Sequence, residues 1–177
     1  ILKKISKKKS LRLIDIKKVK YELDDLTNNK LSDFQKKNLY MAIEAAKLCN
    51  LSQNKILSSL NKIKSVNGRL ELIRTFPNNV KVYVDFAHTP DALLKCIISL
   101  KKLYNNDVSL VFGCGGDRDF KKRSLMAKIA SSNCRKIYVT DDNPRNEKPE
   151  KIRKQIIENI KNFRSFNIAN RSAAIKT

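Results

Sequence analysis

The residues best suited to chemistry form the segment Asp141–Arg145, which reads Asp-Asp-Asn-Pro-Arg and follows the apolar run Ile137–Val139. Its carboxylates and amide can bind an ammonium group, whereas its guanidinium can hold a carboxylate through two parallel hydrogen bonds. The proline stiffens the turn on which these groups stand. The segment therefore predicts a site for a ligand that is both cationic and anionic.

Polar clusters follow two other apolar runs in the same way. The alternating residues Val80, Val82 and Val84 lead into residues 85–91, and a second run leads from Val108 into residues 113–119. In open α/β sheets, ligands bind beyond the carboxyl ends of the strands. Each of the three clusters is therefore a candidate binding loop.

Residues 113–116 contain three of the four glycines in the chain. Glycine permits a positive φ and lets a ligand approach backbone N–H groups, which suits phosphate or carboxylate oxygens. The segment matches neither the G-x-G-x-x-G fingerprint nor a P-loop, which requires Gly-Lys-Ser/Thr. A tight turn between strand and helix, without a ligand, is the structural alternative.

The elements that must position these clusters are strands and helices in alternation. Helices are predicted at residues 89–103, 123–131 and 149–163. Thr89 and Pro90 suit the start of the first helix, and Leu125, Met126 and Ile129 are expected to point inward from the second. Right-handed crossovers between parallel strands would bring all three clusters to one edge of a single sheet. We therefore predict an α/β fold with a Rossmann-like, mostly parallel sheet.

Residues 1–74 have a more helical pattern. The elements predicted there are a helix at residues 32–49 capped by Ser32 or Asp33, a second helix at residues 51–63 and a strand at residues 70–74. A turn rich in proline and asparagine at residues 75–79 indicates a boundary. We expect two domains, residues 1–74 and 75–177, with residues 1–31 forming sheet or loop in the first.

Composition excludes several kinds of site. The four cysteines lack C-x-x-C spacing, which argues against a zinc site or disulfide framework and indicates a cytoplasmic protein with reduced thiols. Because His88 is the only histidine, we assign no metal ligand in the chain. Any metal is expected to be a hard ion held by oxygen atoms and ligand phosphates.

The formal net charge of +21 is typical of nucleic-acid binders, but the lysines are scattered and only residues 3–9 form a dense run. We therefore expect no specific nucleic-acid partner. No apolar run approaches the roughly 18 residues of a membrane span, so no membrane insertion is expected. We expect a monomer, and because the sequence starts at Ile1 and stops inside a predicted helix, we expect an excerpt of a longer chain.

Taken together, the motifs resemble the Mur ligase family. The motifs that resemble its carboxy-terminal domain are Asp85–Leu93, residues 113–119 with Lys122 and Arg123, and Thr140–Arg145. Upstream, residues 34–46 and Gly68–Glu71 resemble the end of the family's central ATPase domain and the junction that follows it. The resemblance extends over about residues 32–175, and four motifs in the right order make it specific.

The resemblance implies an ATP-dependent amide ligase of peptidoglycan synthesis. The motifs are similar to those of ligases that join meso-diaminopimelate to UDP-N-acetylmuramoyl-L-alanyl-D-glutamate, so these two compounds are the implied partners and ATP and Mg²⁺ the implied cofactors. In such ligases the D-glutamate side-chain carboxylate is phosphorylated, and the incoming amine attacks the acyl phosphate. This chemistry needs positioning and charge neutralisation.

Residues at matching positions take roles from the resemblance. Asp142, Asn143, Pro144 and Arg145 match the recognition motif for meso-diaminopimelate, and Arg118 matches a second residue that contacts the carboxylate of the amino acid. The structural alternatives are a surface ion pair of Arg145 with Glu147 or Asp142, and an ion pair between Asp117 and Arg118. Lys122 and Arg123 are expected to be surface residues at a helix start.

A second group of residues matches positions that contact ATP. Arg69 and Asp85 belong to this group, Asn38 matches an asparagine on the adenine side, and His88 lies near the phosphates or orders its own loop. Asp85 could instead cap the following helix, and Asn38 could simply be solvated. No catalytic residue is assigned.

The departures from the family pattern leave other functions open. The chain lacks a P-loop, the family's modified lysine, a UDP-binding domain and the later Gly-Lys-Gly-His-Glu motif, so the fragment is expected to be inactive alone. One alternative is a sibling ligase of the folylpolyglutamate, cyanophycin or lysine-adding type. The other is a non-catalytic nucleotide-binding module.

Overall fold

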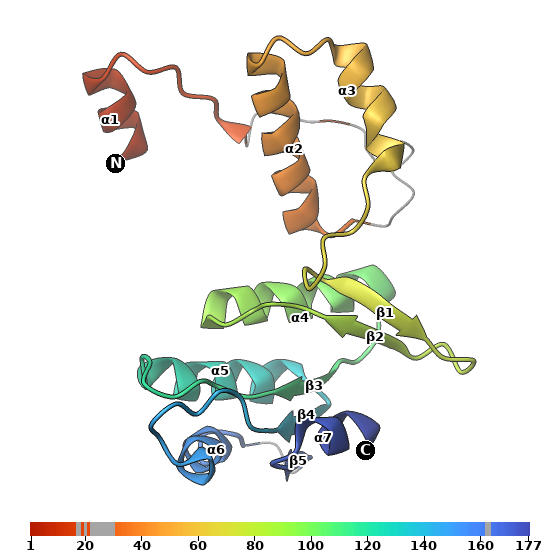
Figure 1. Ribbon diagram of the computed structural model, residues 1–177, viewed down its shortest axis with the longest axis vertical. Helices are drawn as coiled ribbons and strands as arrows, with labels where there is room; N and C mark the ends of the chain where they lie inside the picture. Colours follow the sequence, from red (N-terminus) through yellow and green to blue (C-terminus); the bar gives the residue numbers. More distant parts are fainter. Residues whose placement is uncertain (17–18, 20, 22–30, 162–163) are drawn as a thin grey trace. The chain divides into compact units, whose positions relative to one another are not determined.

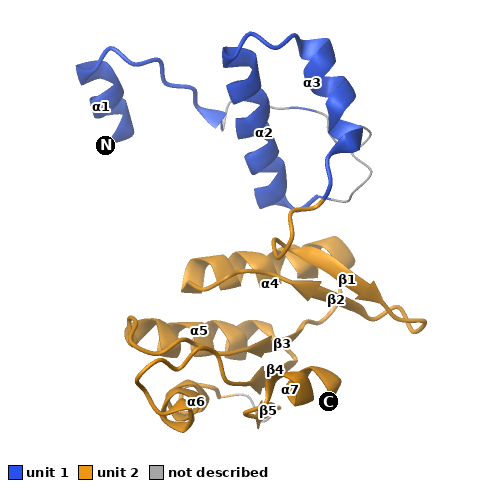
Figure 2. Cartoon of the chain, viewed as in Figure 1, with its two compact units in different colours: residues 1–64 blue, residues 65–177 orange. Residues whose placement is uncertain are grey.

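The computed structural model describes residues 1–16, 19, 21, 31–161 and 164–177. The chain divides into two compact units, residues 1–64 and residues 65–177, which Figure 2 shows in different colours. This division falls earlier than the boundary expected from the turn at residues 75–79. The reason is that the strand β1 (Glu71–Thr75) pairs with β2 (Lys81–Val84), so the turn joins two strands of the second unit.

The first unit is helical in its described part (Figure 1). Its elements are α1 (Leu2–Lys8), α2 (Asp33–Leu48), α3 (Gln53–Ser59) and the short 3-10 helix η2 (Leu60–Lys62). Ser32 and Gln35 form a capping box at the start of α2, as the sequence predicts for Ser32. Ile43, Ile56 and Leu60 form its core.

The expectation of sheet or loop at residues 1–31 is wrong where α1 forms, and residues 17–18, 20 and 22–30 lie outside the described residues. The dense lysine run belongs to α1, where no residue is buried. An exposed helix tolerates these like charges because water screens them. Among the described residues, no helix combines the length and the apolar character needed to cross a membrane.

The second unit contains the predicted parallel sheet. The strands β3 (Ser109–Phe112), β4 (Lys136–Val139) and β5 (Ser165–Asn167) lie parallel in the order β3-β4-β5. The helices of this unit are α4 (Pro90–Tyr104), α5 (Lys121–Asn133), α6 (Pro149–Ile157) and α7 (Arg171–Lys176). The α/β fold class with a parallel sheet is thereby confirmed.

One part of the sheet prediction is wrong. The strand β2 does not join the parallel sheet; it pairs antiparallel with β1 in a separate two-stranded sheet. The alternating pattern of β2 is compatible with either arrangement, because sequence alternation does not identify the neighbouring strand. Only two of the three polar clusters therefore leave the parallel sheet.

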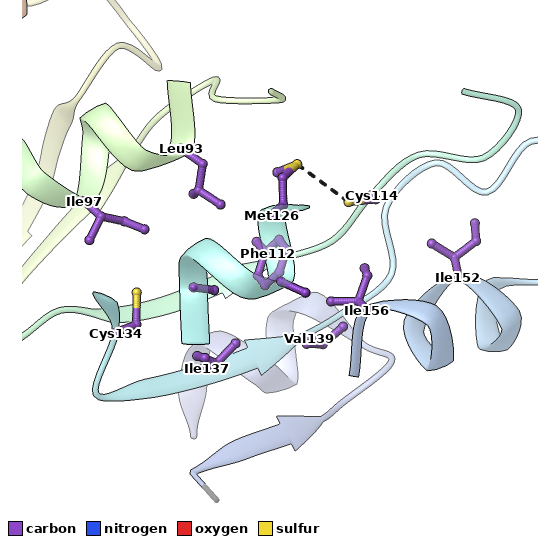
Figure 3. Packing of buried hydrophobic residues seen from close by; sticks show 12 residues of the cluster. Leu93, Ile97, Phe112, Cys114, Met126, Cys134, Ile137, Val139, Ile152 and Ile156 are labelled. Atoms are coloured by element: carbon purple, nitrogen blue, oxygen red, sulfur yellow. Dashed lines mark hydrogen bonds between the residues drawn. The ribbon is translucent and has the colours of Figure 1, made fainter. Parts of the chain in front are cut away.

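A single row of helices covers one face of β3 and β4. Leu93 and Ile97 of α4, residues of α5, and Ile152 and Ile156 of α6 pack on the inward-facing strand residues (Figure 3). The strand residues in this core are Phe112, Ile137 and Val139. Thr89 and Pro90 begin α4 as predicted, with the Thr89 hydroxyl accepting from the Ala92 backbone N–H. The core thus fixes the rigid frame from which the loops at the sheet edge emerge.

The helix α5 buries a face that differs in part from the predicted one. Met126, Ala127 and Ala130 are buried, Leu125 is 49% exposed, and Arg123 is only 1% exposed. Positions 123, 126, 127 and 130 share one face of a helix, because residues three and four apart lie one above the other. The expectation that Leu125 points inward and that Arg123 lies on the surface is therefore wrong.

Candidate functional site

The register of the parallel sheet brings two loops together. Phe112 at the end of β3 lies beside Val139 at the end of β4, and the Thr140 N–H donates to the Phe112 carbonyl at 3.0 Å. We call residues 113–119, which follow β3, the glycine loop, and residues 140–147, which follow β4, the Asp-Asn-Pro-Arg loop. Both leave the same edge of the sheet, as predicted for these two clusters.

The glycines serve the close contact between these two loops. A Cβ on Gly116 would lie 1.8 Å from the Pro144 carbonyl oxygen, and one on Gly113 would lie 2.3 Å from the Thr140 oxygen. The Gly116 N–H donates to the Asn143 carbonyl at 2.8 Å. Among the described glycines only Gly68 has a positive φ, so the positive φ expected in the glycine loop is absent. These glycines are needed for close approach of backbone to backbone.

Arg145 joins the two loops through its side chain. Its Nη1 donates to the Gly116 carbonyl at 2.6 Å, and its backbone N–H donates to Asn143 Oδ1 at 3.2 Å. The residue has φ 49, a left-handed conformation that the turn imposes. The alternative ion pairs of Arg145 with Glu147 or Asp142 do not occur among the ion pairs of the described residues. Arg145 is an exposed residue, so the remaining donors of its guanidinium can meet a ligand.

The other predicted ligand contacts lie on the same two loops. Asp142 and Arg118 are both exposed. Asp142 Oδ1 accepts the Asn143 N–H at 2.8 Å, and its Oδ2 lies 3.9 Å from Arg171 Nη2. The alternative ion pair of Arg118 with Asp117 is absent from the ion pairs of the described residues, and Asp117 Oδ2 accepts from the Asn146 side chain at 2.8 Å. The tertiary structure thus gathers cations and carboxylates on adjoining loops.

A buried ion pair beneath the loops was not predicted. Arg123 Nη2 and Nη1 donate to the two carboxylate oxygens of Glu147 at 2.7 and 2.9 Å. Arg123 also donates to Gln155 Oε1 at 2.7 Å and to the Gly115 carbonyl at 3.2 Å. A sequence signal existed, because position 123 shares the helix face of Met126 and Ala127.

A second ion pair holds the start of the Asp-Asn-Pro-Arg loop. Arg153 of α6 is buried and pairs with Asp141, and its Nε donates to Asn167 Oδ1 at 2.8 Å. Arg171 Nη2 donates to the Asp141 carbonyl at 3.0 Å. Asp141 therefore serves the loop itself, whereas Asp142 remains exposed to solvent.

The Arg123 guanidinium lowers the pKa of Glu147 to about 2, from the ordinary value of 4.5. Because the pKa is lower in the folded state, this carboxylate adds stability above about pH 4.5, and that contribution is lost as the pH falls toward 2. We expect Glu147→Gln to remove it. In urea unfolding of the 177-residue chain, the free-energy difference between the wild type and Glu147→Gln should be large at pH 6 and shrink toward pH 2.

Glu150→Gln, a change at an exposed position in the first turn of α6, is the matched control, and its difference from the wild type should depend much less on pH. A difference for Glu147→Gln that stays constant from pH 6 to pH 2 would contradict the proposed ion pair.

Three of the four residues assigned to ATP lie around one turn. The Arg69 guanidinium lies over the Phe86 ring at 5.2 Å. Asp85 accepts the Leu70 N–H at 2.7 Å and the Ala87 N–H at 2.8 Å, and His88 Nδ1 lies 3.1 Å from the Phe86 carbonyl. Asp85 therefore closes the turn and does not cap α4, which Thr89 does. This contact is compatible with a His88 that orders its own loop, and its place near the phosphates stays a prediction.

Asn38, the fourth of these residues, is an exposed residue of α2 in the first unit. The arrangement of the two units therefore decides whether it joins the other three. Its role in binding adenine stays a prediction.

Cys114 in the glycine loop is not suited to nucleophilic chemistry. It is buried, its Sγ lies 4.0 Å from Met126 Sδ (Figure 3), and burial raises the pKa of its thiol. A raised pKa leaves little of the reactive thiolate. None of the four cysteines forms a disulfide, and no cluster of three or more histidine, cysteine or acidic side chains suited to a metal occurs among the described residues.

Comparison with known proteins gives consistent matches. The family model described as Mur ligase, glutamate ligase domain, matches residues 68–177. The chain is 44% identical over 148 residues to the UDP-N-acetylmuramoyl-L-alanyl-D-glutamate–2,6-diaminopimelate ligase of Rickettsia montanensis, a match that covers 82% of this chain and 30% of that protein. The chain thus spans about 30% of the length of this relative.

Solved structures agree with this match. A structure of a UDP-N-acetylmuramoyl-L-alanyl-D-glutamate–2,6-diaminopimelate ligase is 36% identical, with a TM-score of 0.59 over 83% of this chain and 30% of that one. The folylpolyglutamate synthase of Thermotoga maritima has a TM-score of 0.68 at 23% identity, over 99% of this chain and 45% of that one, which shows a shared fold alone.

The matched region contains the parallel sheet, its helical layer, the glycine loop and the Asp-Asn-Pro-Arg loop. The match therefore rests on the same elements that build the candidate site. The chain belongs to the Mur ligase family, with the glutamate ligase domain at residues 68–177.

Proposed function

We propose that this chain is part of an ATP-dependent ligase that joins meso-diaminopimelate to UDP-N-acetylmuramoyl-L-alanyl-D-glutamate in peptidoglycan synthesis. The main support is the group of exposed residues on two adjoining loops, which includes Arg118, Asp142 and Arg145. The far end of meso-diaminopimelate bears both an ammonium and a carboxylate group. Relatives that are 40–44% identical bear the name of this ligase, which supports the same substrate.

The proposed contacts with the ligand follow from the charges of the side chains. Arg145 and Arg118 bind the distal carboxylate, and Asp142 with Asn143 binds the distal ammonium group. Pro144 fixes the turn so that these side chains keep their spacing. Lysine lacks the distal carboxylate and would leave both guanidinium groups without their partner, so this surface discriminates against it.

ATP with Mg²⁺ supplies the phosphoryl group that activates the acceptor carboxylate. Arg69 suits the nucleotide because its guanidinium is exposed beside an aromatic ring. Asp85 retains acceptor capacity for a ribose hydroxyl, since each of its carboxylate oxygens accepts one backbone N–H and has a second lone pair. His88 and Asn38 complete the proposed nucleotide contacts, and no described residue is assigned to the metal.

We further propose that the first unit is the end of a central ATP-binding domain, and that the whole protein is a cytoplasmic monomer without a dedicated nucleic-acid partner. The cysteines form no disulfide, which supports a reducing compartment. Sequencing the DNA on both sides of the coding segment tests the first point. A P-loop upstream and a Gly-Lys-Gly-His-Glu motif downstream would identify a ligase fragment, whereas stop codons at both ends would favour a stand-alone module.

A grafted ligase tests the substrate. The grafted ligase is the Rickettsia montanensis relative in which the segment that matches this chain has been replaced by this chain. We expect phosphate release from ATP that depends on UDP-N-acetylmuramoyl-L-alanyl-D-glutamate and on meso-diaminopimelate, with a kcat/KM for L-lysine lower by about 100-fold or more, since a lost charged hydrogen-bonding partner costs up to about 3 kcal/mol. The unmodified relative is the control for assembly. Equal or better use of lysine would contradict the proposal.

A further inference from the structure

The buried guanidinium of Arg123 contacts both loops of the proposed amino-acid site and the helix beside them. It reaches the glycine loop at the Gly115 carbonyl, the Asp-Asn-Pro-Arg loop at Glu147 and the helix α6 at Gln155. Its exposed fraction is 1%, so it cannot meet a substrate. Any role it has in the reaction is therefore exerted through the groups that it holds.

Glu147 extends this network back to the glycine loop. The same Oε1 that pairs with Arg123 Nη2 accepts the Asp117 N–H at 2.6 Å. The neighbouring Asn146 donates to Asp117 Oδ2, and Arg145 donates to the Gly116 carbonyl. The chain around Arg118 is thus tied to the chain around Arg145 through a carboxylate that Arg123 neutralises.

The chemistry of this contact favours arginine. The planar guanidinium serves two carboxylate oxygens, an amide oxygen and a backbone carbonyl with its terminal nitrogens. Its Nε is buried without a hydrogen-bond partner in the described structure. A lysine ammonium is a single point charge and cannot reach these acceptors in one plane.

We propose that Arg123 is a positioning residue for the incoming amino acid. It sets the spacing between Arg118 and Arg145 by fixing the glycine loop and the Asp-Asn-Pro-Arg loop to α5 and α6. This inference rests on the proposed function for the identity of the amino acid, but the alignment of the loops is a property of the chain itself. A displacement of about 1 Å between binding groups can reduce reactivity about 100-fold.

The first test measures the loops without any substrate. Amide hydrogen exchange in the 177-residue chain reports on the Gly116 and Asp117 N–H groups, which donate to the opposite loop. Arg123→Met should increase the exchange rates of these two amides by about 10-fold or more relative to amides of the core strands. Arg123→Lys should have an intermediate effect, because it keeps the positive charge but not the planar guanidinium that pairs with two oxygen atoms at once.

Ile97→Ala is the matched control. Ile97 is a buried residue of α4 in the same core and contacts neither loop through any hydrogen bond. Its loss lowers the stability of the domain without changing the ion pair. We expect this variant to raise exchange evenly across the domain. The same even pattern in Arg123→Met would overturn the positioning role, whatever the substrate of the ligase.

The second test measures the reaction of the grafted ligase. Arg123→Met should raise the KM for the amino acid by about 10- to 100-fold while the KM for ATP changes little. The double variant Arg123→Met/Glu147→Gln should resemble the single variant, because the two residues act as one unit. Equal changes in all kinetic constants, as expected for Ile97→Ala, would overturn the inference.

The two proposals fail in different ways. If the unsubstituted grafted ligase prefers lysine, the proposed substrate is wrong, and the KM for lysine then tests Arg123 in the same manner. If it prefers meso-diaminopimelate and Arg123→Met leaves that KM unchanged, the proposed function stands and the positioning role is overturned. If the graft has no activity, hydrogen exchange alone decides about Arg123.

Discussion

Replacing Arg145 by alanine is expected to raise the KM of the grafted ligase for meso-diaminopimelate by about 10- to 100-fold, with little change in the KM for ATP. The reason is that hydrogen bonds to charged groups contribute about 1.5 to 3 kcal/mol each. The exposed guanidinium has one donor engaged with the Gly116 carbonyl and others available for a carboxylate. Steady-state kinetics with each substrate varied in turn measures this split.

Two further substitutions distinguish the effect of losing the guanidinium from the effect of backbone strain at position 145. Arg145 has φ 49, which glycine adopts without strain and alanine does not. Arg145→Gly should therefore raise the KM as much as Arg145→Ala, although it relieves the turn. Arg145→Lys should retain charge but lose the forked geometry, and so fall between the wild type and Arg145→Ala. An unchanged KM in Arg145→Ala would refute the proposed carboxylate contact.

Gly116→Ala is expected to cause the largest loss of stability among single substitutions in these loops. The added Cβ would lie 1.8 Å from the Pro144 carbonyl oxygen and 2.6 Å from its carbon, so the backbone of one loop must move. Overpacking of this kind costs about 3 kcal/mol or more, which lowers the midpoint of thermal unfolding by roughly 10 °C in a domain of this size. Circular dichroism of the chain during heating measures the shift.

Gly115→Ala is the matched control in the same loop. Its Cβ would lie 2.9 Å from Arg145 Nη1 and 3.4 Å from the Asn143 oxygen. The nearer atom is the end of a flexible side chain, which can move at a cost of about 1 kcal/mol or less. Equal thermal shifts for the two variants would show that the loops do not interlock through their backbones as the structure describes.

The interlocked loops explain why three glycines gather in one segment. Sequence reasoning attributes them to positive φ and to a ligand near the backbone, and the structure attributes them to the approach of Thr140 and Pro144. Both interpretations depend on the absence of a Cβ. They differ in what occupies the space beside the glycine, which is a ligand in the first and the backbone of the other loop in the second. A sequence identifies the need for a small residue without naming the atom that occupies the space, because that atom belongs to a segment far along the chain.

The local elements of the second unit were accessible to sequence reasoning. The start of α4 follows from Thr89 and Pro90, whose effects act within one helical turn. The start of α6 follows from the spacing of Ile152 and Ile156, which are buried, although the helix ends at Ile157 and the prediction extends it to residue 163. Such signals act over a few residues, so they do not depend on the partners that each element later contacts.

Sequence reasoning does not identify in the same way which elements and side chains contact one another. The alternating residues of β2 predict a strand, but not that β1 would be its antiparallel neighbour. Arg123 stands among lysines in the sequence, a position typical of the surface, yet it is the most deeply buried charged side chain in the described structure. The free energy of burying a guanidinium depends on acceptors that other segments provide.

By itself, the sequence determined the segments that form β2, β3, β4, α4, α5 and α6, the loops that bear charged and amide groups, and the family to which the motifs are similar. Only the tertiary structure decided that Arg123 meets Glu147, 24 residues away, and that Asp117 meets Asn146, 29 residues away. Capping and periodicity act between near neighbours and can be seen in the order of residues. Contacts across the sheet edge exist only after β3 and β4 have paired, since that register sets where each loop begins.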